Sequence, residues 1–283
     1  MIKILSDSTC DLSSELLTKY DIDIIPLHVM LGDEEYEDGV NISPEEILKW
    51  SDANNTTPKT SAPSIETAIA KISPFLENDG EVIIFVISED MSTSGNVMRM
   101  AAEELNAESR VHVINSKSLS SGIGLLILEA AVMAQNGLKA SELVEKIEML
   151  VPRVRASFVV DTLEYLHRGG RCSSVSALIG SALKLHPEIT VANGKMVAAR
   201  KYRGKIDKVI LSYVSDKENE IRKAKKDFAF ITHSECDRDI VESVRKYLEG
   251  LNVFNEIFET DAGGVISSHC GPGTLGVLFI DGE

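Results

Sequence analysis

The chain has 283 residues, of which 43% are apolar and 26% are charged, and its formal net charge is −15. This length suits two domains of ordinary size or one large domain, and the acidic balance argues against nucleic acid or an anionic bilayer as a standing partner. No apolar stretch reaches the roughly 18 residues of a membrane-spanning helix and no signal peptide is recognisable, so we expect a cytoplasmic protein without stable membrane insertion.

The first half of the chain alternates short apolar runs with longer helical patterns. Strands are expected at 2–5, 22–30, 82–87 and 111–114. Helices are expected at 11–19, from 43 onward, and at 97–105, 122–136 and 141–150. Strands separated by helices form parallel sheets, so residues 1–153 are predicted to be an α/β domain with its ligand site beyond the carboxyl ends of the strands.

The pattern changes after Pro152, where a domain boundary is expected. Strands are predicted at 157–160, 188–191, 195–199, 228–232, 254–259 and 277–280, with helices at 206–214 and 239–248. Asn193-Gly194 lies between two of these strands and is a strong hairpin signal. Residues 154–283 are therefore predicted to be an α+β domain with a mostly antiparallel sheet.

The most distinctive segment is glycine-rich: residues 271–276 read G-x-G-x-x-G. In dinucleotide-binding proteins this spacing opens a helix within a strand–helix–strand unit. Here a strand-like apolar run follows at 277–280, so a nucleotide site is not indicated. The glycines are interpreted as a stretch of backbone beside His269 that the polar head of a ligand can approach closely.

Hydroxyl-rich segments flank several of the predicted elements. They occupy residues 6–9, 60–64, 88–95 and 115–116. Each alone is typical of helix capping. Because strand ends of a parallel sheet converge on one edge, hydroxyl donors from different segments can together surround an anion that only accepts hydrogen bonds.

Six motifs stand out: Asp7-Ser8-Thr9 with Asp11-Leu12, and the segments 60–64, around 92, 120–124, 162–171 and 269–276. In order and spacing they resemble the DegV family along the whole chain. The resemblance implies two domains with a long-chain fatty acid bound between them and no catalysis or further cofactor. In many bacteria such proteins are the fatty-acid-binding subunit of fatty acid kinase. A separate kinase subunit phosphorylates the bound carboxylate to an acyl phosphate for phospholipid synthesis, where an acyltransferase is a further possible partner.

The resemblance also implies which residues hold the carboxylate. They are Thr60 or Ser61, Ser92 and His269, with Arg203 a weaker candidate, and Arg171 is assigned to partner docking or loop geometry. Two segments depart from the family pattern: Ser92-Thr93-Ser94-Gly95, and His186-Pro187-Glu188-Ile189, expected in a loop. Candidates for an apolar tunnel are the helix at 125–133 and residues 177–180.

The residues themselves leave an enzyme as the alternative, acting on a small lipid or acyl substrate. It would be a hydrolase using Cys270 beside His269, or a phosphoryl transferase using Asp7. Adjacent residues of a strand point to opposite faces, which disfavours the first. No cysteine spacing indicates a disulfide framework or a zinc site, so no metal is expected, and a monomer is the default. His233 is interpreted as structural.

Overall fold

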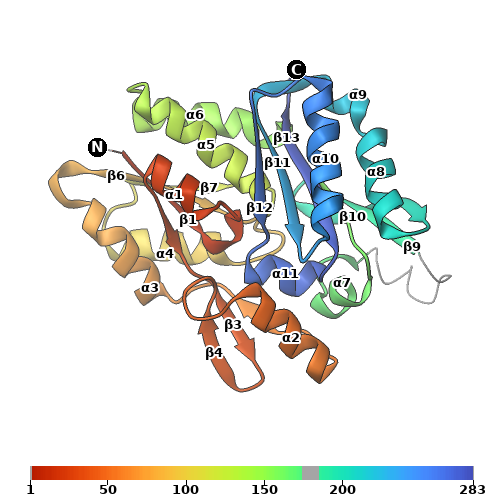
Figure 1. Cartoon of the computed structure of the whole chain (residues 1–283). Helices are drawn as coiled ribbons and strands as arrows, with labels where there is room; N and C mark the ends of the chain where they lie inside the picture. Colours follow the sequence, from red (N-terminus) through yellow and green to blue (C-terminus); the bar gives the residue numbers. More distant parts are fainter. Residues whose placement is uncertain (1, 174–184, 283) are drawn as a thin grey trace.

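The computed structural model describes residues 2–173 and 185–282 (Figure 1). In the N-terminal half, residues 2–153, the elements are β1 Ile2–Asp7, α1 Ser14–Tyr20, β2 Ile22–Ile25, β3 His28–Leu31, β4 Glu34–Glu37, α2 Pro44–Asn54, β5 Lys59–Ser61, α3 Ile65–Ile72, β6 Glu81–Val86, α4 Ser94–Glu104, β7 Val111–Asn115, α5 Ser121–Gln135 and α6 Ala140–Leu150.

In the C-terminal half, residues 154–282, the elements are β8 Val154–Val159, α7 Glu164–Gly169, β9 Leu185–Ala192, β10 Lys195–Arg203, α8 Ile206–Asp216, α9 Glu218–Ile221, β11 Ala224–Ser234, α10 Arg238–Leu251, β12 Glu256–Asp261, α11 Gly264–Cys270 and β13 Thr274–Asp281. The domain boundary between residues 153 and 154 stays a prediction. Among the helices of the described residues, none has the length and apolar character needed to cross a membrane.

The N-terminal half is built on a parallel sheet in the order β2-β1-β6-β7, as predicted. Its central strand β6 is an unbroken apolar run from Val82 to Val86, all of it inaccessible to solvent. Such runs are typical of parallel strands covered on both faces. The single extended segment predicted at 22–30 is wrong, because it forms β2 and β3 in two different sheets. Pro26 separates them, and its ring nitrogen cannot donate to a ladder.

A second, three-stranded antiparallel sheet in the order β4-β3-β5 was not predicted. Its strands are short and two of them carry mainly polar residues, so no apolar alternation marks them in the sequence. Register places Val29 of β3 opposite Thr60 of β5. This small sheet therefore fixes where a predicted site residue lies.

The C-terminal half contains a six-stranded sheet in the order β10-β9-β8-β13-β11-β12, which is mostly antiparallel as predicted. The pair β11 and β12 is parallel. Asn193 and Gly194 join β9 to β10 with φ angles of 50° and 82°, and Ala192 pairs with Lys195. Two consecutive positive φ angles make the tight hairpin turn that this dipeptide indicates.

Helix α5 lies between the two large sheets (Figure 1). Residues 121–131 of this helix are all buried, and α5 contacts β1 and β6 on one side and β8, β11 and β13 on the other. Helices α3 and α4 cover the opposite face of the parallel sheet, and α8 and α10 cover the opposite face of the six-stranded sheet. The molecule thus stacks in five alternating layers of helices and sheets. A helix that is apolar all round belongs at the centre of such a stack.

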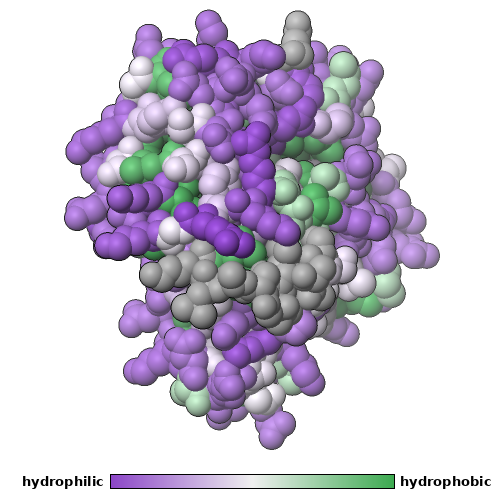
Figure 2. Space-filling view, turned by 90° about the vertical axis from the view of Figure 1, so that its right-hand side faces the viewer, coloured by the Kyte–Doolittle hydropathy of each residue, from purple (hydrophilic) through white to green (hydrophobic). Residues whose placement is uncertain are grey.

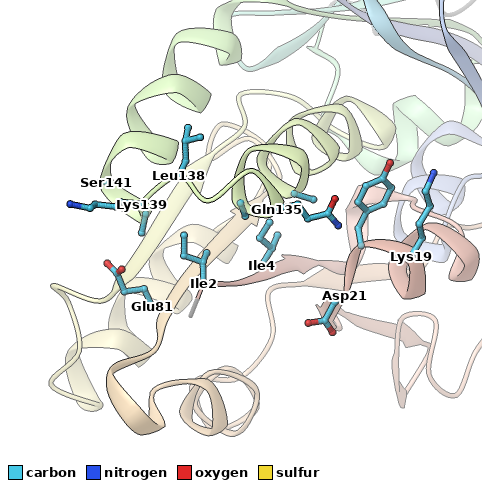
Figure 3. A pocket seen from close by; sticks show the side chains of 13 residues that line it. Ile2, Ile4, Lys19, Asp21, Glu81, Gln135, Leu138, Lys139 and Ser141 are labelled. Atoms are coloured by element: carbon cyan, nitrogen blue, oxygen red, sulfur yellow. The ribbon is translucent and has the colours of Figure 1, made fainter.

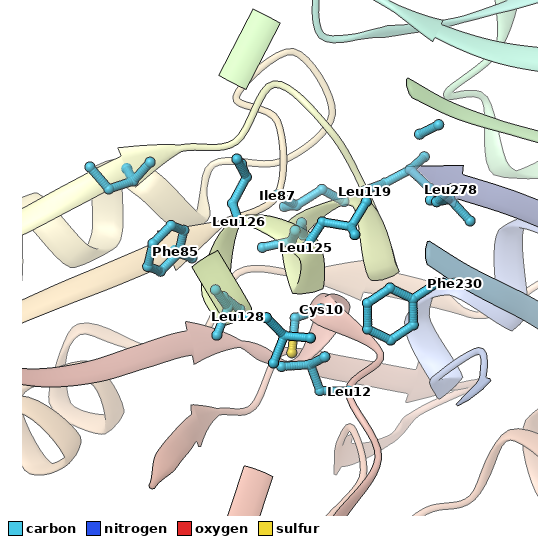
Figure 4. Close-up of a cluster of buried hydrophobic side chains, with 14 of the residues drawn as sticks. Cys10, Leu12, Phe85, Ile87, Leu119, Leu125, Leu126, Leu128, Phe230 and Leu278 are labelled. Carbon is cyan, nitrogen blue, oxygen red and sulfur yellow. The ribbon is translucent and has the colours of Figure 1, made fainter. Parts of the chain in front are cut away.

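The largest apolar cluster draws on both halves (Figure 4). Leu125 of α5 lies among Leu12 and Phe85 from the N-terminal half and Phe230 and Leu278 from the C-terminal half. The two halves therefore share one continuous core. Burying a side chain of this size contributes about 1.5–3 kcal/mol.

Replacing Leu125 by alanine tests this shared core. We expect L125A to lower the free energy of unfolding by about 2–5 kcal/mol, because it removes fully buried methyl groups and leaves a cavity. Urea unfolding followed by circular dichroism measures the change. Leu211→Ala on α8 is the matched control, since that side chain is 38% exposed. Equal losses in both variants would contradict a core centred on α5.

Candidate functional site

One cavity brings together most of the predicted site residues. It has a volume of about 40 Å³ and lies beyond the carboxyl ends of β2 and β6, between the small sheet and α11. Its polar lining residues are Thr60, Ser61, Ser92, Arg171 and His269. Its apolar lining residues are Leu27, Ile87, Met91, Leu119, Met196, Val265, Ile266 and Cys270. Arg203, at the last residue of β10, is not among the lining residues.

His269 reaches this cavity from helix α11 and meets a residue of the N-terminal half. Its Nε2 atom lies 3.0 Å from Oγ1 of Thr60 on β5. The treatment of His269 and Cys270 as adjacent strand residues is wrong, because both lie on α11. The side chains of Val265 and Ile266 on the same helix are buried. The helix ends at Cys270, and Gly271 follows it with a φ of 79°.

The other side of the imidazole faces backbone. Nδ1 of His269 is buried and has no hydrogen-bond partner among residues 2–173 and 185–282, and a Cβ atom built on Gly169 of α7 would lie only 2.3 Å from it. Any side chain at position 169 would displace the ring. The close approach of α7 thus sets the position of the imidazole relative to Thr60.

The environment of His269 keeps its imidazole neutral. Burial, and then the charge of Arg171, lower its pKa from 6.5 to about 4. A neutral imidazole carries a single N–H group. At pH 7 the ring can therefore donate one hydrogen bond to a carboxylate oxygen without forming an ion pair.

The hydroxyl groups of the cavity come from two different elements. Ser92 follows β6, as predicted, and its Oγ lies 3.0 Å from Oγ of Ser94 at the start of α4. Thr60 and Ser61 lie on β5 of the small sheet, not at an end of the parallel sheet. Both groups nevertheless line one cavity, which gives an anion hydroxyl donors from two sides.

The structure also shows where Arg171 lies, and where the two segments that differ from the family pattern lie, residues 92–95 and 186–189. Nη1 of Arg171 donates to the carbonyl oxygen of Gly169 at 2.9 Å, and the residue is exposed at the edge of the cavity. Of residues 92–95, Ser92 lies in the loop before α4, Thr93 is the N-cap residue, and Ser94 and Gly95 begin the helix. The loop expected at 186–189 is wrong, because these residues belong to β9, where buried Glu188 pairs with Lys217 at 2.7 Å. Of the tunnel candidates, 177–180 lie outside the described residues.

Sequence reasoning missed that three carboxylates are buried close together near the start of α11. Asp7, Asp11 and Asp38 are almost inaccessible to solvent, and burial raises the pKa of all three, to about 6 for Asp7 and about 8 for Asp11. Each accepts hydrogen bonds from hydroxyl or backbone N–H groups. The first two belong to motifs read from the sequence, whereas nothing around Asp38 marks it.

A larger groove of about 750 Å³ lies at the opposite ends of the strands (Figure 3). Ile2, Ile4 and Leu138 share it with Lys19 and Glu81. It borders the amino ends of β1 and β6, whereas ligands of open parallel sheets bind beyond the carboxyl ends. The surface in Figure 2 is largely hydrophilic, with apolar residues in small groups. The 40 Å³ cavity is therefore the better candidate site.

Comparison with known proteins identifies the family. The family model described as "Uncharacterised protein, DegV family" matches residues 1–282. The chain belongs to the DegV family. A DegV domain-containing protein of Clostridium perfringens is 31% identical over 280 residues, which are 99% of this chain and 98% of that protein.

Solved structures of DegV proteins have the same fold. A DegV family protein from Thermus thermophilus, described as binding fatty acid, superposes with a TM-score of 0.90 at 29% identity, covering 99% of both chains. A stearic acid-binding protein from Eubacterium ventriosum superposes with a TM-score of 0.86 at 28% identity, covering 100% of this chain and 99% of the other. The expected two-domain DegV architecture is thereby confirmed.

The low pKa of His269 in this DegV chain is directly measurable. We expect its imidazole resonances to stay unchanged between about pH 8 and pH 5.5, because the ring gains its proton only near pH 4. A histidine NMR titration, with His269→Gln to assign the signal, measures this. A midpoint near 6.5 would contradict a desolvated ring.

Proposed function

We propose that this chain binds a long-chain fatty acid and holds its carboxylate in a head-group clamp formed by Thr60, Ser61, Ser92 and His269. The observation that carries the proposal is the convergence of a neutral histidine and three hydroxyl groups on one cavity whose other lining residues, apart from Arg171 at its edge, are apolar. Two proteins of the same fold, a DegV family protein from Thermus thermophilus and a protein from Eubacterium ventriosum, are described as binding fatty acids. The clamp residues themselves rest on this geometry and on the family resemblance.

The chemistry of a carboxylate matches these donors. An ionised carboxylate only accepts hydrogen bonds. The clamp has three hydroxyl groups and one imidazole N–H, and one proton of the Thr60–His269 pair is used in the hydrogen bond between them, which leaves up to three donors for a ligand. Each hydrogen bond to a charged group contributes about 1.5–3 kcal/mol, so two or three of them offset much of the cost of removing the carboxylate from water. The acyl tail adds about 0.8 kcal/mol for each buried methylene.

The tail needs more room than the cavity provides. Ligand pockets ordinarily have volumes of about 300–1,000 Å³, so about 40 Å³ accepts a chain only if lining side chains move. Met91 and Met196 face the cavity and are suited to this, because unbranched methionine side chains adapt to irregular space. We place the tail against these residues and the shared core beside α5.

We further propose that the bound fatty acid is a substrate for a separate fatty acid kinase, which converts the carboxylate to an acyl phosphate for phospholipid synthesis. In the clamp, none of the four side chains carries a formal positive charge at neutral pH, and Arg171 stands at the exposed edge. A carboxylate held by neutral donors keeps its nucleophilic character. The division of labour follows: this chain binds and presents, and the partner supplies ATP chemistry.

The alternative of an enzyme has little support in the geometry. Burial raises the pKa of the Cys270 thiol to about 12, so the thiolate needed for attack is scarce at neutral pH. Asp7 is buried and already accepts hydrogen bonds from Thr9 and from the backbone N–H of Ile87. Cys270 lines the cavity but stays a thiol at neutral pH, and Asp7 does not line the cavity, so neither meets the needs of a nucleophile.

Native mass spectrometry of the purified protein tests fatty acid binding. We expect a bound species of fatty acid mass that disappears after denaturing extraction, or uptake of added palmitate or oleate by protein stripped of lipid. The absence of both would refute the proposal. Adding a fatty acid kinase catalytic subunit and ATP then tests presentation, through formation of an acyl phosphate.

Substitutions in the clamp test which residues bind the carboxylate. His269→Ala and Thr60→Val should each weaken palmitate binding about tenfold or more, because each removes a hydrogen-bonding group of the proposed clamp. Displacement of a fluorescent fatty acid measures the affinity. His112→Gln on β7 is the control histidine, since it lies outside the lining of the cavity. Unchanged affinity in His269→Ala would remove that residue from the clamp.

A further inference from the structure

The helix that carries His269 is held at its start by the N-terminal half. The carboxylate of Asp38 packs against the start of α11, beside the backbone N–H groups of its first two residues, Gly264 and Val265. Asp11 accepts one from Gly263 at 2.9 Å. His269 lies five residues further along, or about 7.5 Å at 1.5 Å per residue. A displacement at the start of α11 would therefore carry over to the imidazole.

Asp38 is also tied to the strand pair that carries Thr60. Oγ of Ser8 donates to Asp38 at 2.7 Å and accepts from the backbone N–H of Leu27 at 3.2 Å. The N–H of Asp38 donates to the carbonyl oxygen of Leu27 at 2.8 Å. Leu27 lines the cavity and immediately precedes β3, which pairs with β5.

The fit between Asp38 and α11 leaves no spare space. A Cβ atom built on Gly264 would lie 2.6 Å from Oδ1 of Asp38 and 2.5 Å from Cδ1 of Ile47. Asp38 is itself 3% exposed. The contact is a short, buried connection between backbone and carboxylate, of the kind that fixes a helix start.

We propose that Asp38 is a positioning residue of the head-group clamp: it holds the start of α11, which carries His269, and, through Ser8 and Leu27, the strand pair that carries Thr60. Asp38 does not line the cavity, so it acts on the ligand only through the positions of His269 and Thr60. The inference rests on the proposed function, since it assigns a role in binding the carboxylate of a fatty acid.

The test compares two ligands with the same tail. Palmitate and hexadecanol differ in the head group, so the ratio of their affinities, the carboxylate preference, reports on the clamp and not on the tail site or on overall stability. Asp38→Ala should lower this preference about tenfold. Asp38→Asn should stay within about threefold of the original protein, because its amide oxygen can still lie beside the α11 N–H groups.

Two further variants keep the test decisive. Ser8→Ala removes one link of the network, leaves Asp38 in place, and should lower the preference in the same direction even if Asp38→Ala does not fold. Glu129→Gln is the matched control, because it weakens another contact between the halves, the ion pair of Glu129 with Lys225 at 2.6 Å, and should leave the preference unchanged.

The outcomes separate the two proposals. If the original protein binds neither ligand, the proposed function fails and the role of Asp38 fails with it. If the original protein prefers palmitate and both Asp38→Ala and Ser8→Ala keep that preference, only the positioning role is overturned. It is also overturned if Glu129→Gln lowers the preference as much as Asp38→Ala, or if Asp38→Asn behaves like Asp38→Ala.

Discussion

Burial of one helix between two sheets is the constraint on which the rest of this structure depends. Helix α5 presents apolar side chains in every direction, so neither sheet alone can cover it. Covering it from both sides fixes the parallel sheet against the six-stranded sheet and brings α11 beside the loops that follow β1 and β6. Residues more than two hundred positions apart, Thr60 and His269, come within 3.0 Å as a result. The site is a product of the packing between the halves.

The site differs from an anion site built on fixed positive charge. Among its described lining residues the one cation, Arg171, is exposed at the edge, and burial keeps the histidine in its neutral form. The low pKa of His269 makes the stability of the fold depend on pH. Between pH 6.5 and about pH 4 the unfolded chain binds a proton at His269 that the folded chain does not. The neutral histidine therefore contributes to stability above pH 6.5, and this contribution is lost as the pH falls towards 4. Asp11, whose pKa is raised to about 8, contributes in the opposite sense and loses its contribution as the pH rises through that value.

Much of the fold could be predicted because apolar periodicity survives wherever an element is buried. Strand β6, helix α5 and the hairpin at Asn193-Gly194 each follow from local residues. The polar lining of the cavity also followed, from motifs that the chain shares with its family. The small sheet could not be predicted, because β5 is three residues of Lys, Thr and Ser whose pairing with β3 is decided by distant packing. Asp38 escaped notice for the same reason: its role is set by Gly264 and Val265, far along the chain.

Helix α11 lies near the end of the chain, so it is synthesised long after the parallel sheet. Domains generally form from the N-terminus while the ribosome is still adding residues, and the parallel sheet is complete in sequence once β7 has been made. The helix with His269 emerges about 150 residues later, at roughly 5–20 residues per second. During that interval the hydroxyl groups of β5 and the side chains of Asp11 and Asp38 lack their contacts with α11, because that helix has not yet been synthesised. The proposed head-group clamp therefore stays incomplete until the penultimate element of the chain has left the ribosome and docked.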